Sequence, residues 1–600
     1  MKKVSLGIFH YNAQYVAGRR DSYWKQTRAS LIPQLKFHKH HPNWKCDLEI
    51  SGHHLLFLER HFPAVLETLR QLNNKGTIEL VTVHYSDQIY LAYPKRDLLE
   101  SIKICDEIYA KLGLIKSPVW FGQENFFGEG IIRVMKETEY KIALVNRNQY
   151  SYFHSDVPQA PYYRFKGYDA DILLSGTNGQ KNLVEQTWNF WGDGELAFAR
   201  ANIYFPNYGP SSKKYATRVA RSRQQEIDGV EFLTISEYIA WCKQEHLQPA
   251  ELHPLLDGSW NHFQYGGAYL WMGTSRFPFE RDGDVRSLTF QSRAKILAAE
   301  IMVAAAQQEG INVDVETRNL RVAWKHQLLA EVSDSTGQTP VKIEVVYSIV
   351  EAQRALEIAE KIICAVLKKL HQTSYAVETK SGKLLQESEY YDLSSGRRTH
   401  ISYDTFRKSL NLHFWLQNIK LNSTRISFYK VGSNRYDIDL SFYSKYTHFY
   451  QRVLSLLRTR KKKGLARALE DHICNYSGMW WNWNSSTIAY CPATMEEQPV
   501  EYALTEFENG RQWIPAPNGY LQVRPDLHVV KHNLVGNTHI CFTCDAQNHR
   551  MGLILLNPPR TPFLWRLSFI QGSREQAITL ANQLNVWPIV KLGTTFRLTK

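Results

Sequence analysis

The stretch DLLESIKICDEIYAKLG (residues 97–113), followed closely by PVWFGQE (118–124), decides the fold. The first segment repeats apolar residues at helical spacing and ends in glycine, the residue that most often follows a helix. The second segment is a short apolar run, which is typical of a buried strand. Because the strand follows the helix after only a few residues, the pair indicates one step of a repeating β/α chain.

The same alternation extends in both directions. A helix is predicted to end before 73–76, with Leu58, Leu66 and Leu72 at helical spacing and Pro63 in its first turn. Repeated β/α units predict a parallel sheet, either open or closed into a barrel. The other predicted strands are KVSLGIF (3–9), KCDLEIS (45–51), TIELVTVHY (77–85), KIALVNRN (141–148), DADILLS (169–175) and LVEQTWNFW (183–191).

The pattern changes twice further along the chain. AWKHQLLAEV (323–332) and SIVEAQRALEIAEKIICAVLKKL (348–370) predict helices of a small bundle. From about residue 372, short alternating strands such as TRISFYK (424–430) predict a β-sandwich-like region, with inserted helices near 448–470 and 573–584. We therefore expect three domains, α/β at 1–285, helical at 286–371 and β-rich at 372–600.

The composition narrows the class of protein. The net charge is +14, but Lys and Arg are scattered among acids, so the case for a nucleic-acid partner is weak. No window reaches the roughly 18 apolar residues that a membrane-spanning helix needs. The first residues lack a small-residue cleavage site, and eight cysteines do not make a disulfide framework. We expect a cytoplasmic protein, and the sequence leaves a homo-oligomer open.

Polar residues gather at the ends of the predicted strands. In open sheets and barrels of parallel strands, ligand sites collect at the carboxyl ends of the strands. Residues that end separate strands are therefore expected to meet at one edge. These residues are His10, Glu49, Glu79, His84, Glu124 and Asp193.

Two carboxylates stand in aromatic surroundings. Glu124 lies in FGQENFF and Asp193 in WNFWGDGEL. Cleavage of a glycosidic bond needs such a pair, because one carboxylate attacks or stabilises the anomeric carbon and the other protonates the leaving oxygen. Aromatic side chains suit the apolar face of a sugar ring, and a third aromatic segment (257–271) adds Trp260. Alternatively, the aromatic residues of these segments pack in the hydrophobic core and do not contact a sugar.

The order and spacing of these segments resemble glycoside hydrolase family 57. That family usually begins with His-x-His-x-Pro, where this chain has His10, Asn12 and Gln14, and its motif tryptophan is replaced by Phe121, with Trp120 one place earlier. The segments that carry the resemblance are FHYNAQ, GTIELV with Glu79, Phe121-Gly-Gln-Glu124, Asp193-Gly-Glu195, Ser259-Trp260 and LLAEVSD with Asp334.

The resemblance implies a (β/α)7-type barrel whose active site is completed by the helical bundle. It implies a retaining α-glycosidase or α-glucan transferase, with Glu124 as nucleophile and Asp193 as acid/base, acting on an α-linked oligosaccharide or polysaccharide. The residues implied to contact the carbohydrate substrate are His10, Asn12, Glu79, His84, Trp120, Phe121, Trp191, Trp260 and Asp334.

Related families raise the question of a metal. Family 38 α-mannosidases share the architecture of barrel, bundle and β-domain, and need a metal held partly by His-x-Asp and a late His-Asp. The corresponding places here hold His10-x-Asn12 and Ser333-Asp334. Asparagine is a poor replacement for an anionic ligand, and Ser333 removes an imidazole. Polysaccharide deacetylases hold their metal with an Asp and histidines, and we find no such set of residues in this sequence. We therefore expect no metal and no cofactor.

Two other functions stay open from the sequence. The altered first motif fits a non-catalytic carbohydrate-binding or regulatory protein on the same scaffold, although both carboxylates are present. Nucleic-acid binding through the basic C-terminal half is the third hypothesis, and salt-sensitive retention on DNA or RNA is its test.

Overall fold

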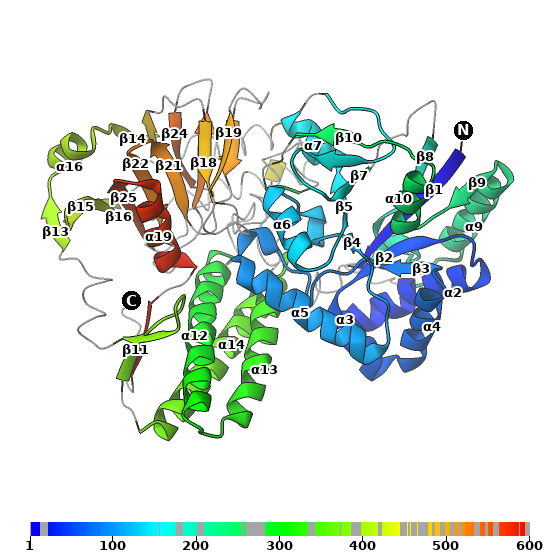
Figure 1. Ribbon diagram of the computed structural model, residues 1–600, viewed down its shortest axis with the longest axis horizontal. Helices are drawn as coiled ribbons and strands as arrows, with labels where there is room; N and C mark the ends of the chain where they lie inside the picture. The colour runs from blue at the N-terminus through cyan, green and yellow to red at the C-terminus, as the bar shows by residue number, and fades with distance from the viewer. Residues whose placement is uncertain are drawn as a thin grey trace. The chain divides into compact units, whose positions relative to one another are not determined.

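The computed structural model divides the chain into two compact units (Figure 1). The first comprises Met1–Tyr90 and Arg96–Ala268, and the second Leu91–Lys95 and Tyr269–Lys600. The expected bundle and β-rich domains therefore share one unit. The structure describes residues 2–11, 22–154, 156–175, 184–200, 209–253, 255, 257–259, 282–333, 342–371, 374–385, 398–417, 423–443, 453, 456–457, 465, 478–482, 487–491, 499–503, 511–514, 519–532, 540–545, 550–555, 563–586 and 589–593.

The strands of the first unit form two mostly parallel sheets. They are β1 (Lys2–Tyr11), β2 (Cys46–Ile50), β3 (Ile78–Leu80), β4 (Val119–Trp120), β5 (Ile142–Asn146), β6 (Tyr163–Phe165), β7 (Asp171–Ser175), β8 (Val184–Asp193), β9 (Val230–Phe232) and β10 (Ala250–Leu252). One sheet has the order β3-β2-β1-β8, with β9 also paired to β1, and the other has the order β10-β6-β7-β5-β4. A parallel bridge between Thr82 and Phe121 joins the two sheets.

Helices connect these strands as the sequence predicts. They are α1 (Ser22–Gln26), the π-helix η2 (Thr27–Leu31), α2 (Ile32–His40), α3 (Gly52–His61), α4 (Pro63–Asn74), the 3-10 turn η3 (Tyr90–Ala92), α5 (Lys95–Leu112), the 3-10 turn η4 (Gln123–Asn125), α6 (Glu129–Glu137), α7 (Arg147–Phe153), α8 (Gly194–Ala197), α9 (Ser212–Ile227) and α10 (Ile235–Gln244). The predicted helix through Leu58 and Leu72 is two helices, because Pro63 cannot continue α3 and begins α4 instead.

The core of the first unit lies between its two sheets and the surrounding helices. Val4 of β1, Val119 of β4, Leu144 of β5 and Leu173 of β7 belong to one buried apolar cluster. Parallel pairing brings the carboxyl ends of β1, β2 and β8 to one edge. Pairing between β8 and β10 is not among the pairs of described strands, so closure into a barrel stays a prediction.

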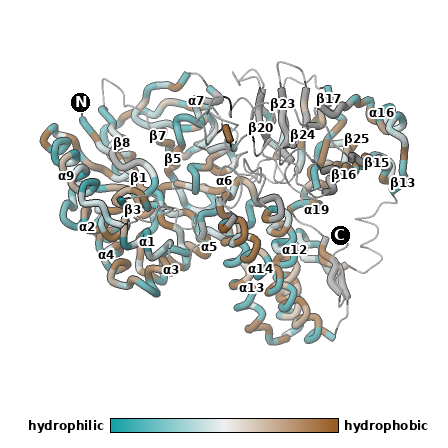
Figure 2. Tube along the Cα trace, turned by 180° about the vertical axis from the view of Figure 1, so that it is seen from behind, coloured by the Kyte–Doolittle hydropathy of each residue, from teal (hydrophilic) through white to brown (hydrophobic). Residues whose placement is uncertain are grey.

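Three long helices lie together in the second unit (Figure 1). Hydrophobic and hydrophilic residues alternate along them, as expected of helices that bury one face (Figure 2). The predicted boundary between residues 285 and 286 falls inside the first of them. Within the described residues, no helix is long and apolar enough to cross a membrane. The helices of this unit are α12 (Asp282–Gln308), α13 (Asp314–Ala330), α14 (Lys342–Lys369), α16 (Tyr403–Leu410) and α19 (Arg574–Asn585).

The described strands of the second unit pair antiparallel, as predicted. An eight-stranded sheet has the order β13-β15-β16-β25-β22-β21-β18-β19, a five-stranded sheet β14-β17-β24-β23-β20, and a small sheet β12-β11-β26. Trp481 packs edge-on against Phe569, with ring centroids 6.0 Å apart, so the two larger sheets are in contact. The predicted helix at 573–584 is α19, and the one at 448–470 lies mostly outside the described residues. The strands are β11 (Ser374–Glu378), β12 (Lys383–Leu385), β13 (Arg398–Ile401), β14 (Phe414–Gln417), β15 (Ser423–Val431), β16 (Arg435–Tyr443), β17 (Gly478–Asn482), β18 (Thr487–Tyr490), β19 (Val500–Ala503), β20 (Arg511–Ile514), β21 (Tyr520–Arg524), β22 (Leu527–Lys531), β23 (Ile540–Asp545), β24 (Arg550–Leu555), β25 (Phe563–Gln571) and β26 (Ile589–Gly593).

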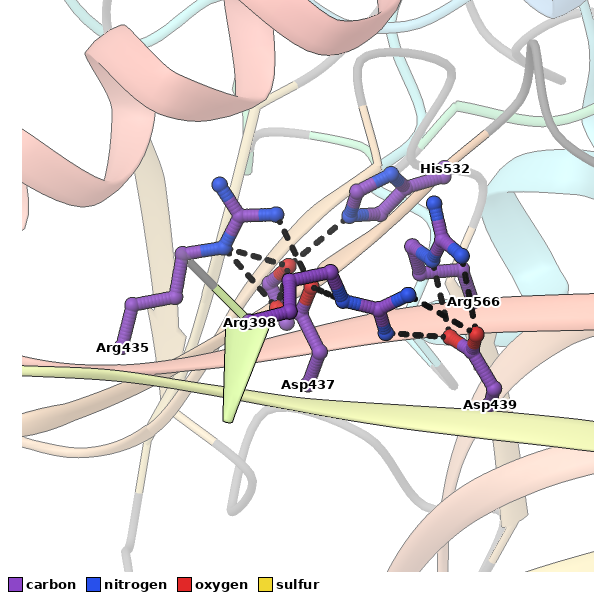
Figure 3. A network of polar contacts seen from close by, with 7 residues as sticks. Arg398, Arg435, Asp437, Asp439, His532 and Arg566 are labelled. Atoms are coloured by element: carbon purple, nitrogen blue, oxygen red, sulfur yellow. Dashed lines mark hydrogen bonds and ion pairs between the residues drawn. The ribbon is translucent and has the colours of Figure 1, made fainter. Parts of the chain in front are cut away.

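An ion-pair network ties neighbouring strands of the eight-stranded sheet together (Figure 3). Asp439 accepts two hydrogen bonds from Arg398, at 2.8 and 3.0 Å, and two from Arg566, both at 2.8 Å. Asp437 is fully buried and accepts from Arg435 and from the hydroxyl of Ser568. Each carboxylate is thus held by several donors, which compensates for its removal from water.

Replacing Asp437 by asparagine should lower the free energy of unfolding by about 3–5 kcal/mol, because it leaves the guanidinium of Arg435 with no carboxylate partner at a largely buried place. The matched control is Asp526→Asn, which breaks the exposed pair with Arg524 and should cost about 1 kcal/mol or less. Denaturant unfolding of both variants checks this. Equal losses in the two would contradict a special role of the buried pair.

Candidate active site

Three polar residues form a row at the carboxyl ends of adjacent strands. In the pairing of β1 with β2 and β8, His10 lies opposite Glu49 on one side and opposite Asp193 on the other. Paired strands are about 4.8 Å apart, and residues in register point to the same face of a sheet. The fold therefore brings His10, Glu49 and Asp193 together although they lie far apart in the sequence.

His10 carries a positive charge in this row. Its Nδ1 lies 2.6 Å from Oε2 of Glu49, whose side chain is fully buried. Burial by itself lowers the pKa of His10, but the ion pair and hydrogen bond with Glu49, helped by the charges of Glu124 and Glu195, raise that pKa to about 10. His10 Nε2 has no hydrogen-bond partner among the described residues.

The His10 pair should make stability depend on pH in the alkaline range. A folded-state pKa of about 10, above the ordinary 6.5, stabilises the protein fully below pH 6.5 and loses this contribution as pH rises through about 10. The difference in free energy of unfolding between the wild-type protein and His10→Asn should therefore shrink between pH 6.5 and 10. Urea unfolding at pH 6, 8 and 10 measures it, and a constant difference would contradict the ion pair.

Glu124 lies in a strained turn directly after β4. Its φ is 53° and that of Asn125 is 51°, so two successive non-glycine residues adopt the left-handed conformation. Such strain costs about 1–3 kcal/mol per residue and persists where the surroundings enforce it, often at functional sites. The Asn125 amide donates to the Leu144 carbonyl at 2.8 Å, and the Gln123 backbone N–H donates to Nε2 of His84 at 3.0 Å. The turn thus holds the Glu124 backbone in one conformation.

The glycines and aromatics around Glu124 pack this turn tightly. A Cβ on Gly122 would clash with the hydroxyl of Tyr90. Trp120 is fully buried, and its indole N–H donates to that same hydroxyl at 3.4 Å. We predicted Trp120 as a substrate contact, but its burial leaves no ring face for a sugar. Phe121 is 5% exposed and meets the ring of His10 edge-on, with centroids 5.9 Å apart.

The end of β8 supplies two acids. Asp193 ends the strand with an exposed side chain, whereas Glu195 is buried in the first turn of α8. The hydroxyl of Ser30 donates to the Gly194 carbonyl at 2.5 Å and accepts from the Phe198 N–H at 3.0 Å, which holds this turn in place. We did not predict Glu195 as a site residue. Its spacing of two from Asp193, at the end of a strand, was the available signal.

Two predicted substrate contacts have other partners. Glu79 accepts from Ser117 Oγ at 2.7 Å and from the N–H of Ser236, in the first turn of α10, at 3.2 Å. It pairs with Asp47, two residues before Glu49 and thus below the His10 row. Burial lowers the pKa of His84, whose neutral Nε2 accepts from Gln123. Both residues therefore support the framework of the site.

The remaining predicted contacts cannot be placed. Asn12, Trp260 and Asp334 lie outside the described residues. For Trp191, only the backbone within β8 is described, where it pairs with Ile8. Their roles stay predictions from the resemblance.

The metal of the family 38 comparison does not fit the row. A histidine that binds a metal must offer it a nitrogen lone pair, but Nδ1 of His10 already faces Glu49. No group of three or more His, Cys, Asp or Glu side chains suited to a metal occurs in the described part of the chain. We therefore assign no chemical step to a metal.

Comparison with known proteins agrees with this geometry. The model of glycosyl hydrolase family 57 matches residues 3–248, which include His10, Glu124 and Asp193. Residues 3–248 therefore resemble family 57 in sequence. The resemblance seen in the sequence is thus confirmed for this part of the chain, and LLAEVSD lies beyond the match.

Sequence relatives match short segments of the chain. An α-amylase of Pyrococcus horikoshii is 26% identical over 146 residues, which cover 24% of this chain and 23% of that protein. A 4-α-glucanotransferase of Thermococcus litoralis is 26% identical over 117 residues, 20% of this chain and 18% of that protein. The chain thus spans less than a quarter of the length of these relatives.

Whole-chain likeness comes from solved structures. An α-mannosidase from Enterococcus faecalis V583 superposes with a TM-score of 0.62 over 99% of this chain and 90% of its own, at 9% sequence identity. A second Enterococcus faecalis protein, of glycosyl hydrolase family 38, has a TM-score of 0.56 at 8% identity. At such identities the likeness shows a shared fold, including the bundle and the β-rich region.

Proposed function

We propose that the protein is a retaining α-glycosidase or α-glucan transferase that uses Glu124 as nucleophile and Asp193 as acid/base. The observation that carries this proposal is the convergence on His10. Asp193 lies opposite His10 in the strand register, and the charge of Glu124 acts on the same imidazole. The family 57 match and the names of the relatives, α-amylase and 4-α-glucanotransferase, support the choice of α-linked glucans.

The reaction has two balanced steps. In the first, a Glu124 oxygen bonds to the anomeric carbon while the bond to the leaving sugar breaks, and the Asp193 carboxyl gives its proton to the leaving oxygen. In the second, Asp193 takes a proton from water or a sugar hydroxyl, which attacks the anomeric carbon and releases Glu124. Two inversions give retention, and this requires carboxyl groups about 5–5.5 Å apart.

His10 has a distinct part in this scheme. A nucleophilic carboxylate must be ionised, and an adjacent imidazolium stabilises the ionised form of Glu124. The Nε2–H of His10 can also donate to a hydroxyl of the bound ring. Asp193 is exposed without substrate, and a sugar in the site would remove it from water, which favours the protonated acid needed in the first step.

A screen of α-linked oligosaccharides and aryl α-glycosides, with products separated by chromatography, tests the proposal. Hydrolysis gives shorter sugars only, whereas transfer also gives longer ones. We expect turnover of at least one α-linked substrate with retention at the anomeric carbon. Binding without turnover would indicate the non-catalytic carbohydrate-binding alternative, and an inverted product would refute the assigned mechanism.

A further inference from the structure

Arg286 is a buried arginine that has no carboxylate partner among the residues that the structure describes. It lies in the first turns of α12 and is 4% exposed. Its Nε and Nη1 have no hydrogen-bond partner, and no ion pair joins it to a carboxylate, within the described part of the chain. Burying a guanidinium without an anionic partner costs free energy of folding, so a function that needs this charge is a reason for its presence.

Other arginines of the same unit show what is usual. Arg398 and Arg566, although about a quarter exposed, each hold Asp439 with two hydrogen bonds. Arg293, about two turns further along α12 and almost fully buried, donates to the Val586 carbonyl. Arg286 is more buried than the first two; its side chain bonds to Tyr93, but its Nε and Nη1 have no partner among the described residues.

The guanidinium of Arg286 is nevertheless held in place. It lies over the ring of Tyr93, 4.5 Å from the centroid, and Tyr93 in turn stacks on Phe290 at 5.9 Å. The Tyr93 hydroxyl lies 3.3 Å from Thr289 Oγ1. Because Arg286, Thr289 and Phe290 are spaced at i, i+3 and i+4 on α12, one face of the helix fixes Tyr93, and Tyr93 fixes the guanidinium.

The one acid shown to act here is engaged elsewhere. Burial is the largest cause that raises the pKa of Tyr93. The charge of Glu331, which is fully buried at the end of α13, raises that pKa further, whereas the charge of Arg286 lowers it. Its Oε1 accepts from Gln327 Nε2 at 2.7 Å, and Gln327 also donates to the Thr289 carbonyl at 3.0 Å. Glu331 is thus held by Gln327 and forms no ion pair with Arg286.

We propose that Arg286, supported by Tyr93, binds the oxyanion of a small ligand, a carboxylate or a phosphate monoester. The fork of the guanidinium matches two oxygens of either group, and the positive end of the 27-residue helix α12 adds attraction. The net charge of the chain, +14, also attracts anionic ligands. This proposal does not rest on the proposed glycosidase activity.

Calorimetric titration of the full chain at constant ionic strength tests the site. The probes are inorganic phosphate, glucose 6-phosphate, glucuronate and neutral glucose. We expect saturable binding of at least one anion and weaker binding of glucose. Preference for the phosphates or for glucuronate distinguishes the two sources of the oxyanion. Absence of saturable binding to every anion overturns the proposal.

Variants locate the binding. Arg286→Gln should weaken it at least tenfold, and Arg286→Lys should weaken it less, because lysine keeps the charge but loses the fork. Arg354→Gln removes an exposed arginine that pairs with Glu351 on α14 and should leave binding unchanged. If Arg286→Gln does not fold, Arg286→Lys decides. Binding equal to wild type in every folded Arg286 variant overturns the assignment.

Discussion

Turnover of an α-linked substrate should fall roughly 10^4-fold or more when Glu124 is replaced by glutamine, the scale of loss seen when an enzyme loses its nucleophile. Glutamine keeps the size of the side chain and the left-handed backbone at residue 124 but cannot form the glycosyl-enzyme. The circular dichroism spectrum should stay that of the wild-type protein. Glu185→Gln, a change at an exposed position of β8, is the matched control and should keep full activity.

The anomeric configuration of a rescued product identifies the role of Glu124. In Glu124→Gly, azide can occupy the emptied place and attack an α-glycosyl fluoride from the opposite face, which gives a β-glycosyl azide. A nucleophile variant makes this product because only one inversion takes place. Wild-type turnover in Glu124→Gln, or an α-glycosyl azide from Glu124→Gly, would remove the nucleophile assignment.

The fold followed from the sequence where the period of the apolar residues is strong. The strand at residues 3–9 is β1, and the helix at 97–113 is α5, closed by Gly113 at a φ of 63°. The strand expected at 77–85 is only Ile78–Leu80; the residues that follow stay buried, and among them Thr82 makes a single parallel bridge to Phe121. Burial gives such a segment the composition of a strand whether or not it pairs.

The site followed from the sequence only in part. Counting strand ends predicted the meeting of His10, Glu49 and Asp193, because parallel pairing aligns such ends. The resemblance, and not the strand ends, predicted Trp120 as a substrate contact; its ring is fully buried, and an aromatic residue beside a catalytic candidate looks the same in sequence whether it packs below the turn or faces a ligand. The framework role of Glu79 depends on α10, which arrives from more than 150 residues away in the chain, and no local pattern reports that contact.

Two acids at the end of β8, Asp193 and Glu195, are candidates for the acid/base role. Asp193 is exposed and in register with His10, whereas Glu195 is buried and its charge acts on His10. An acid/base must reach the glycosidic oxygen, which favours the exposed group. In the proposed mechanism, Glu195 then helps to keep the His10 imidazolium charged.

Replacing Asp193 by alanine should therefore lower turnover of an α-linked oligosaccharide by about 10^2–10^4-fold, the usual contribution of general acid–base catalysis. With a dinitrophenyl α-glycoside, whose leaving group needs no proton, the first step should survive and the glycosyl-enzyme should accumulate. Azide should then speed turnover and give an α-glycosyl azide, because attack on the β-linked intermediate is the second inversion.

The same measurements on Glu195→Ala decide between the two acids. If Glu195 only supports His10, its loss should lower turnover of activated and natural substrates alike, and azide should give no acceleration. The pH dependence should shift as well, because His10 loses one of the charges that keep it protonated. Azide acceleration with an α-glycosyl azide in Glu195→Ala, and its absence in Asp193→Ala, would transfer the acid/base role to Glu195 while leaving Glu124 as the nucleophile.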